Sequence, residues 1–378
     1  MNKIIKMLLF LLTIFVFCST VQGKVIPQKE IYENQLKMSG AENLTQALPK
    51  KTMNTLEKIG LKNINPESIA KIDIQKIFDE ATSESREKFK NIFSHTAVVI
   101  GILLICAIFK NFCPQKNENH LNSIINSVCC LGLCKFIIYP ILQCIAQSRL
   151  IIENAGNFAT ALSAVMIGIL ISLGKPISAS SYHYLVLVAG KIIEKIFSKV
   201  IITVLTAIFG TSVIMSVSQQ SHLEEFCKTA HKTLQSFLKF VSASFVGILT
   251  LQNLITSSAD KISISSAKLM INGFVPIVGG AISDAFETVR GYLNLLKSTV
   301  GAFGIIAGVA IFFPIVTECA LWVVFLHLCK FLSDTLDLKK QSLLFKSIVE
   351  TMKTLVAILI STVVILISST GIILMMGG

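Results

Sequence analysis

The chain has 378 residues, of which 53% are hydrophobic and 15% charged, and its formal net charge is +12. A mean hydropathy of +0.71 is far above that of a soluble domain, so a polytopic membrane protein is predicted. The basic residues are scattered between apolar runs, which indicates contact with anionic lipid and argues against nucleic-acid binding. Most of the 10 cysteines lie inside apolar runs, which excludes a disulfide framework.

Residues 1–23 have the pattern of a cleaved signal peptide. Lys3 and Lys6 precede an apolar run over residues 7–18, and Gly23 stands where cleavage is expected. An uncleaved anchor is the alternative, although this apolar run is short for a membrane span. The mature chain is therefore expected to begin outside the cytoplasm.

Residues 24–94 form the only long polar stretch, and they are predicted to be a helical extracytoplasmic region. Asn65, Pro66 and Glu67 have the order of a helix start, with a capping residue, a first-turn proline and an acid near the positive dipole end. The apolar face that follows is too incomplete for an independent core. These helices are expected to pack on the membrane surface or on another protein.

Residues 95–378 are predicted to be a multi-span membrane domain. We expect an all-α fold with about six to eight membrane helices and additional amphipathic helices. The expected spans cover residues 97–112, 121–145, 158–173, 196–217, 241–255, 299–330 and 355–376.

Three groups of side chains within this domain are interpreted as structural. Cys130 and Cys134 share a helix face, but no further ligand completes a metal site, so packing between helices is favoured. Residues 191–200, which include Glu194, alternate charged and apolar side chains as an interfacial helix start does. His231 is assigned to the solvated polar face of an amphipathic helix over residues 223–238.

A helix break is predicted within residues 272–290. Pro276 lacks a backbone donor, and Gly279 and Gly280 tolerate angles that other residues resist. Polar groups follow at helical spacing: Ser283, Asp284, Glu287 and Arg290. In lipid, broken backbone and charge persist only where protein or water covers them. The stretch either lines a path or forms a packed joint, and it either crosses the membrane or is re-entrant.

The run over residues 299–330 is too long for one upright span, so it is expected to tilt or to bend at Pro314. Gly304 and Gly308 form a small-xxx-small pair that permits close helix approach. Glu318 is an intramembrane acid with either a functional role or a packing role as a hydrogen-bonding carboxyl group. The lysines that follow this run indicate a cytoplasmic loop.

The second half of the chain resembles the stage III sporulation protein AE family of endospore-forming bacteria. The resemblance is carried by FVGILTLQ at 245–252, FVPIVGGAISDA at 274–285, and by Asp260, Val289, Lys297, Gly301 and Pro314. It implies a membrane component of a channel or secretion-like assembly between mother cell and forespore, needed for late forespore gene expression. It also implies a mother-cell membrane location around the forespore, with partners from the same sporulation operon and a forespore-side membrane partner. Whether the chain also forms a homo-oligomer is left open by the sequence.

A permease-like secondary transporter with a discontinuous helix is the alternative function. Asp284, Glu287 and Arg290 share a helix face beside the predicted break, and Lys297 and Glu318 extend this candidate path. No internal repeat supports a transporter fold. The chain has no H-E-x-x-H, G-x-S-x-G or Walker motif, so no enzyme, cofactor or metal site is predicted.

Overall fold

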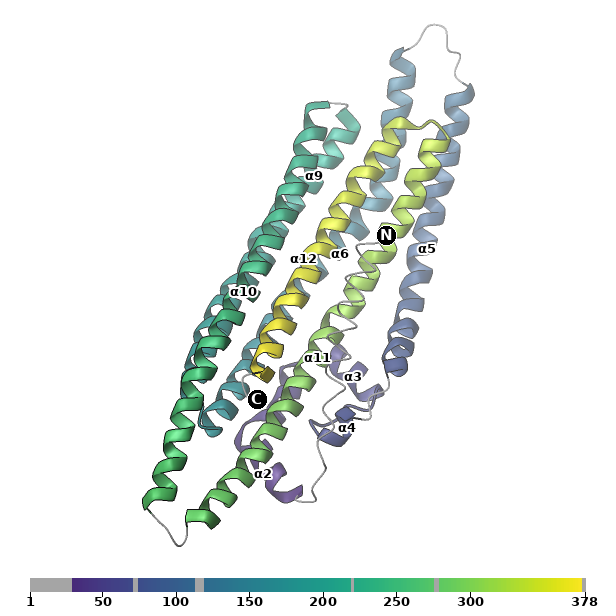
Figure 1. The fold of residues 1–378 in the computed structure, drawn as a ribbon. Coiled ribbons are helices and arrows are strands. Elements are labelled where there is room, and N and C mark those ends of the chain that lie inside the picture. Colours follow the sequence, from purple (N-terminus) through teal and green to yellow (C-terminus); the bar gives the residue numbers. More distant parts are fainter. Residues whose placement is uncertain (1–28, 71–73, 113–118, 219–220, 275–278, 376–378) are drawn as a thin grey trace.

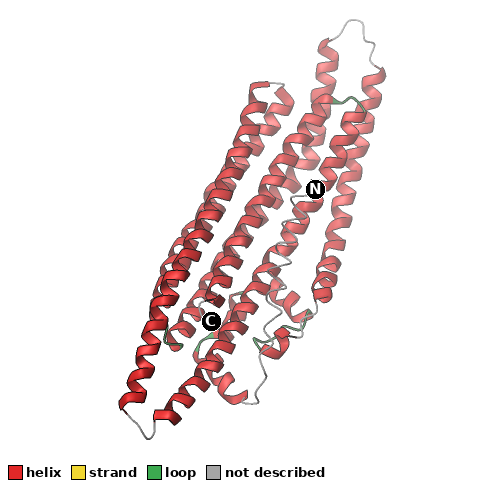
Figure 2. Cartoon of the chain, in the orientation of Figure 1, coloured by secondary structure: helices red, strands yellow, loops and turns green. Residues whose placement is uncertain are grey.

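The computed structural model describes residues 29–70, 74–112, 119–218, 221–274 and 279–375. Within these ranges every regular element is a helix, as Figure 2 shows, so the predicted all-α fold is confirmed. Long helices run side by side along one axis, and short N-terminal helices gather at one end of the bundle (Figure 1). The predicted signal peptide at 1–23 lies outside the described residues.

The helices follow one another in a simple order. The N-terminal group comprises α2 (Lys29–Met38), the 3₁₀ helix η1 (Ala41–Ala47), α3 (Lys50–Lys58) and α4 (Pro66–Ala70). The bundle comprises α5 (Ile74–Phe112), α6 (Asn119–Ser172), α7 (Pro176–Tyr182), the π-helix η2 (His183–Ala189), α8 (Gly190–Lys195), the π-helix η3 (Ile196–Ile201), α9 (Ile202–Ser218), α10 (Ser221–Phe274), α11 (Gly279–Thr335) and α12 (Lys339–Met375).

Six helices among the described residues are long and apolar enough to cross a membrane: α5, α6, the continuous α7–α9 segment, α10, α11 and α12. The 54 residues of α6 span roughly 80 Å at the usual helical rise. The hydrocarbon core of a bilayer is only about 30 Å thick. The longest helices therefore extend well beyond it, and the bundle is a multi-pass membrane domain with projecting ends.

The prediction of separate spans at 121–145 and 158–173 is wrong, because both belong to α6. The polar residues between them resemble a loop in composition but continue the helix. Arg149 Nε lies 3.3 Å from Glu153 Oε1 one turn later, which stabilises the helical conformation. Pro140 also lies inside α6 without ending it.

The predicted helix break is confirmed in position, but it lies between two long helices and not inside one. α10 ends at Phe274 and α11 begins at Gly279, while Pro276 lies outside the described residues. The two helices are antiparallel and come together at one end of the bundle (Figure 1), so the break separates two long helices. α11 also continues through Pro314, which excludes two short halves.

α11 packs against α5, α6 and α12. Glycines permit this proximity, as predicted for Gly304 and Gly308. A β-carbon at Gly304 would lie within 3.0 Å of Leu162 on α6, and one at Gly308 would do so with Leu366 on α12. Each glycine thus faces a different neighbouring helix.

The N-terminal helices pack against the bundle. α2, α3 and α4 contact α11, and η1 contacts α6. The hydroxyl of Tyr32 donates to the carbonyl oxygen of Ile64 at 3.4 Å, which ties α2 to the segment before α4. Burial raises the pKa of Tyr32 to about 12. The sequence predicts that these N-terminal helices need a partner for their apolar surface. The bundle supplies that partner for α2, α3, α4 and η1.

Candidate functional site: polar side chains inside the bundle

The structure describes the side chains of four residues predicted to line a path: Glu287, Arg290, Lys297 and Glu318. Pro276 lies outside the described residues, as do the surroundings of Gly279 and Gly280 and the side chains of Ser283 and Asp284. Near the start of α11, Glu287 is exposed and Arg290 is partly exposed. Lys297 and Glu318 are separated by 21 positions of one helix, or roughly 30 Å, and belong to different clusters.

Lys297 lies near Lys175, at the turn between α6 and α7. Its side chain is buried, and so are those of Lys175 and Asp260. Asp260 on α10 accepts hydrogen bonds from the backbone amides of Ile177 at 3.2 Å and Ser178 at 2.9 Å. These amides are unpaired in an isolated helix, so the carboxylate caps α7 from another element. Asp260 therefore fixes the start of α7 against α10.

Glu318 pairs with a residue that the sequence places in the extracytoplasmic region. Lys88 Nζ on α5 lies 2.5 Å from Glu318 Oε2, and the thiol of Cys144 on α6 donates to Oε1 at 3.7 Å. The Glu318 side chain is only 16% exposed. Phe89 and Phe325 pack beside this pair with ring centroids 5.5 Å apart. The acid is therefore an ion-pair link between α5, α6 and α11.

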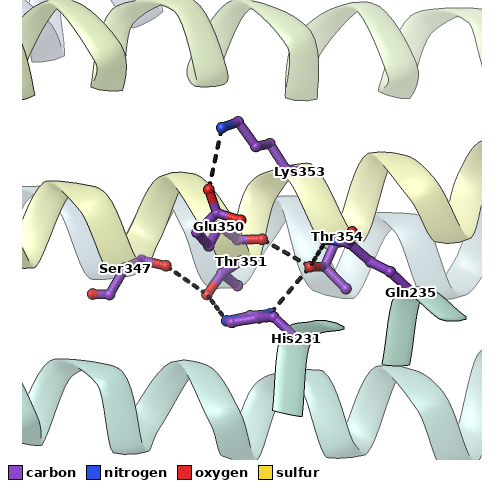
Figure 3. A network of polar contacts seen from close by, with 7 residues as sticks. All are labelled: His231, Gln235, Ser347, Glu350, Thr351, Lys353 and Thr354. Atoms are coloured by element: carbon purple, nitrogen blue, oxygen red, sulfur yellow. Dashed lines mark hydrogen bonds and ion pairs between the residues drawn. The ribbon is translucent and has the colours of Figure 1, made fainter. Parts of the chain in front are cut away.

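His231 is buried between α10 and α12, so its assignment to a solvated face is wrong. Figure 3 shows the ring between two threonines of α12. Nδ1 lies 3.1 Å from Thr354 Oγ1, and Nε2 lies 3.4 Å from Thr351 Oγ1. Gln235, one turn along α10, donates to Thr354 Oγ1 at 3.0 Å. His231 and Gln235 of α10 thus bind α12 instead of solvent.

Hydrogen-bond counting assigns the protons of this network. The Thr354 hydroxyl gives its only proton to the carbonyl oxygen of Glu350 at 2.8 Å. His231 must therefore donate from Nδ1 to Thr354. The Thr351 hydroxyl is shared between the carbonyl oxygen of Ser347 at 3.1 Å and His231 Nε2. When the imidazole is neutral with its proton on Nδ1, and the Thr351 hydroxyl donates to Nε2, every polar side chain of the network has a hydrogen-bond partner.

A fourth cluster surrounds Glu194 on α8, which is also buried rather than interfacial as the sequence suggested. Lys191 Nζ lies 2.7 Å from Glu194 Oε2 and donates to Asn157 Oδ1 on α6 at 3.1 Å. The π-helices η2 and η3 flank α8. Each π turn contains an extra residue and so changes the face onto which later side chains point. This local geometry turns Glu194 inward, a change that simple helical periodicity does not anticipate.

None of these clusters has the composition of a metal centre. Among the described residues, no three histidine, cysteine, aspartate or glutamate side chains are placed to hold a metal ion. Cys130 and Cys134 are buried and unoxidised in α6. The clusters instead pair acids, bases and hydroxyl groups across helix interfaces.

The family model described as Stage III sporulation protein AE matches residues 60–377 of the chain. The chain belongs to the stage III sporulation protein AE family. The stage III sporulation protein AE of Bacillus subtilis (strain 168) is 27% identical over 158 residues. That alignment covers 41% of this chain and 39% of the relative, so it spans about two fifths of either protein. No solved structure matches the chain.

The family match covers all the polar clusters described above. It starts at residue 60, after the end of α3 at Lys58, and runs through all six long helices. The clusters around Asp260, Glu318, His231 and Glu194 therefore all lie within the part of the chain that this sporulation family shares. α2, η1 and α3 precede it.

Proposed function

We propose that this family member is a membrane component of a channel or secretion-like assembly between mother cell and forespore, required for late forespore gene expression. Membership in a stage III sporulation family and the multi-pass bundle support this role. The assembly would include other proteins of the same sporulation operon and a forespore-side membrane partner. The proposed location is the mother-cell membrane around the forespore.

The arrangement of the bundle ends carries this proposal. Because six long helices alternate in direction, the N-terminal helices and the α10–α11 connection lie at the same end (Figure 1). The predicted signal peptide would place that end outside the mother-cell cytoplasm. At the other end, Lys110, Lys339 and Lys340 flank the helix connections, as expected for a cytoplasmic side.

The outer end would then project into the space between the two membranes. α2, α3 and α4 pack there against α11, whose first residues are polar. Such a composite of polar helices suits a protein partner better than lipid. The polar residues that follow the helix break, which include Asp284 and Glu287, would form the centre of this partner surface.

The permease alternative has less support. It depended on a helix broken within the membrane, whereas α10 and α11 are continuous up to their connection at the end of the bundle. Glu318, the last residue of the candidate path, is held by Lys88 at a different level. No described feature joins these residues into a route for a solute.

The proposal is tested by deleting the gene and scoring engulfment, late forespore reporter activity and heat-resistant spores in one time course. We expect normal engulfment followed by a silent forespore. Complementation with Asp284→Asn should leave the protein in the membrane and lower spore yield, whereas Asp337→Asn at the opposite end should complement fully. Normal spores from the deletion strain would refute the sporulation role, and normal spores from Asp284→Asn would refute the partner surface.

A further inference from the structure

A polar surface lies on the outside of the bundle, on either side of the point where α8 contacts α6. There Lys191 Nζ donates to Asn157 Oδ1 at 3.1 Å, and a β-carbon at Gly156 would lie 2.5 Å from Glu194 Cγ. The α6–α8 surface consists of five exposed residues near this contact: Thr160, Ala164 and Gly168 on α6, Lys195 on α8 and Lys199 on η3. The partner surface proposed above lies elsewhere, at the outer end of the bundle.

Both lysines of the α6–α8 surface lack a partner. Glu194, the acid of α8, already lies 2.7 Å from Lys191 Nζ. Glu153 on α6 is paired at 3.3 Å with the arginine one turn before it. In the part of the chain that the structure describes, neither Lys195 nor Lys199 has an ion pair or a side-chain hydrogen bond. The surface therefore presents two positive charges, four positions apart, that the described chain does not neutralise.

This surface lies at a level of the bundle that is otherwise apolar. The cleft beside Glu194 is also lined by Phe245 of α10 and Thr362 of α12. No charged residue occurs at 240–259 of α10 or at 354–375 of α12, and each stretch is roughly 30 Å long, the thickness of the hydrocarbon core. The large exposed side chains of α10 in this stretch are apolar: Phe240, Ile248, Leu251, Leu254 and Ile255. The α6–α8 surface is therefore at the depth of the hydrocarbon core.

A lysine side chain at this depth needs a polar partner. Lys195 and Lys199 follow Glu194 within about one and a half turns, so both lie close to the middle of the charge-free stretches. An ammonium group reaches the headgroups from near a helix end, but not from the middle of a span. Ionisable side chains inside a membrane pair with opposite charges or backbone carbonyl groups, or face a water-filled cavity. A carboxylate on a neighbouring helix would neutralise this surface.

The α6 part of the surface is shaped for such a helix. Thr160, Ala164 and Gly168 are four positions apart and exposed, so they form a line of small side chains along α6. A β-carbon at Gly168 would meet no atom within 4 Å, so no part of this chain packs closely on that position. Gly304 and Gly308 have the same spacing, but leucines of neighbouring helices already cover them. Small residues at this spacing let membrane helices approach closely.

The length of the surface also matches one helix. α6 and the α7–α9 segment are joined by a short turn, so the small residues and the lysines extend in opposite directions from the contact between α6 and α8. From Gly168 to Lys199 the surface covers roughly 25 Å along the bundle. A helix that crosses the hydrocarbon core has a similar length.

We propose that the α6–α8 surface binds a transmembrane helix of another protein, which presents a carboxylate to Lys195 and Lys199 and small residues to the line on α6. The proposal rests on the proposed assembly role, since that role supplies membrane partners. Charge favours such a helix over a second copy of this chain, because two identical surfaces would bring four lysines together. It also favours this helix over lipid tails, which cannot neutralise an ammonium group.

The test uses the full-length protein in lipid nanodiscs and a fluorescent, leucine-rich transmembrane peptide with an alanine face and two glutamates four positions apart near its middle. A matched peptide carries glutamines instead. We expect energy transfer to show about tenfold tighter binding of the glutamate peptide. The double variant Lys195→Gln with Lys199→Gln should remove this preference. Lys228→Gln with Lys232→Gln, which removes two exposed lysines one turn apart on α10, should retain it.

A second pair of variants separates shape from charge. Gly168→Leu should weaken binding of both peptides about tenfold, whereas Gly210→Leu, at an equally open position of α9, should have no effect. Equal affinity of the wild type for both peptides would overturn the proposal. So would a preference that the Lys195→Gln, Lys199→Gln variant retains. The assay contains no other sporulation protein, so its failure is distinguishable from failure of the proposed function in the gene deletion.

The depth of the surface is tested without any peptide. Lys195→Cys in nanodiscs should resist a membrane-impermeant maleimide, with the wild type as the blank. Rapid labelling would place the surface at the headgroups or in water and would overturn the proposal. Self-association of the wild type that Lys195→Gln with Lys199→Gln abolishes would assign the surface to a second copy, and would overturn it as well.

Discussion

The two sides of α12 join their neighbours in contrasting ways. Toward α11, the contact depends on missing side chains, because Gly308 and Gly301 leave room for Leu366 and Leu374. Toward α10, it depends on hydrogen bonds between the His231 ring and the hydroxyl groups of Thr351 and Thr354. The first contact specifies helix distance through steric fit, and the second specifies rotation and register through paired polar atoms. One helix thus uses both means of recognition at different points of its length.

Overpacking the glycine contact should have the largest effect. Gly308→Ala places a β-carbon against Leu366, and we expect a loss of roughly 1–3 kcal/mol in the free energy of unfolding. Gly210→Ala is the matched control, since a β-carbon there meets no atom within 4 Å. Thermal unfolding in nanodiscs measures both variants. Equal stability of the two would show that α11 and α12 are not in close contact.

Removing the polar contact should cost less. His231→Ala breaks two hydrogen bonds between α10 and α12, and polar contacts between membrane helices contribute about 1–2 kcal/mol at most. His183→Ala, at an exposed position of η2, serves as the control and should be neutral. Hydrogen exchange should rise along α10 and the first half of α12 in His231→Ala alone. Unchanged exchange there would contradict the network in Figure 3.

The Lys88–Glu318 pair should give the smallest effect, because the Lys88 side chain is 27% exposed and solvent weakens its attraction to the acid. We expect Lys88→Gln or Glu318→Gln to lower the free energy of unfolding by about 1 kcal/mol or less. A double-mutant cycle measures their coupling. The exchanged pair, Lys88→Glu with Glu318→Lys, should recover part of the loss. Fully additive single effects would show that the two side chains do not interact.

Much of the architecture was predictable because it depends on local sequence. Apolar length predicted the membrane helices, the Pro-Gly-Gly stretch predicted the end of α10, and the spacing of Gly304 and Gly308 predicted close helix contact. The continuity of α6 was missed, because Arg149, Glu153 and their neighbours suit a loop and a projecting helix equally well.

The polar clusters were harder to predict because their partners are distant in sequence. His231 and Thr354 are 123 positions apart, and Lys88 and Glu318 are 230 apart. A single sequence carries no signal for such pairs. Glu194 was placed on a water-facing side because regular helical periodicity was assumed, whereas the π-helices on either side of α8 change that periodicity.

The most direct test of the account is the sidedness of the two bundle ends. Met38 is 89% exposed on α2, Lys339 is exposed at the start of α12, and no described cysteine of the chain is exposed. Met38→Cys and Lys339→Cys can therefore be labelled with a membrane-impermeant maleimide in intact protoplasts of vegetative cells that express the protein in the cell membrane, with the wild type as the blank. The account predicts labelling of Met38→Cys in intact protoplasts and of Lys339→Cys only after permeabilisation. Labelling of both in intact protoplasts, or of Lys339→Cys alone, would contradict it.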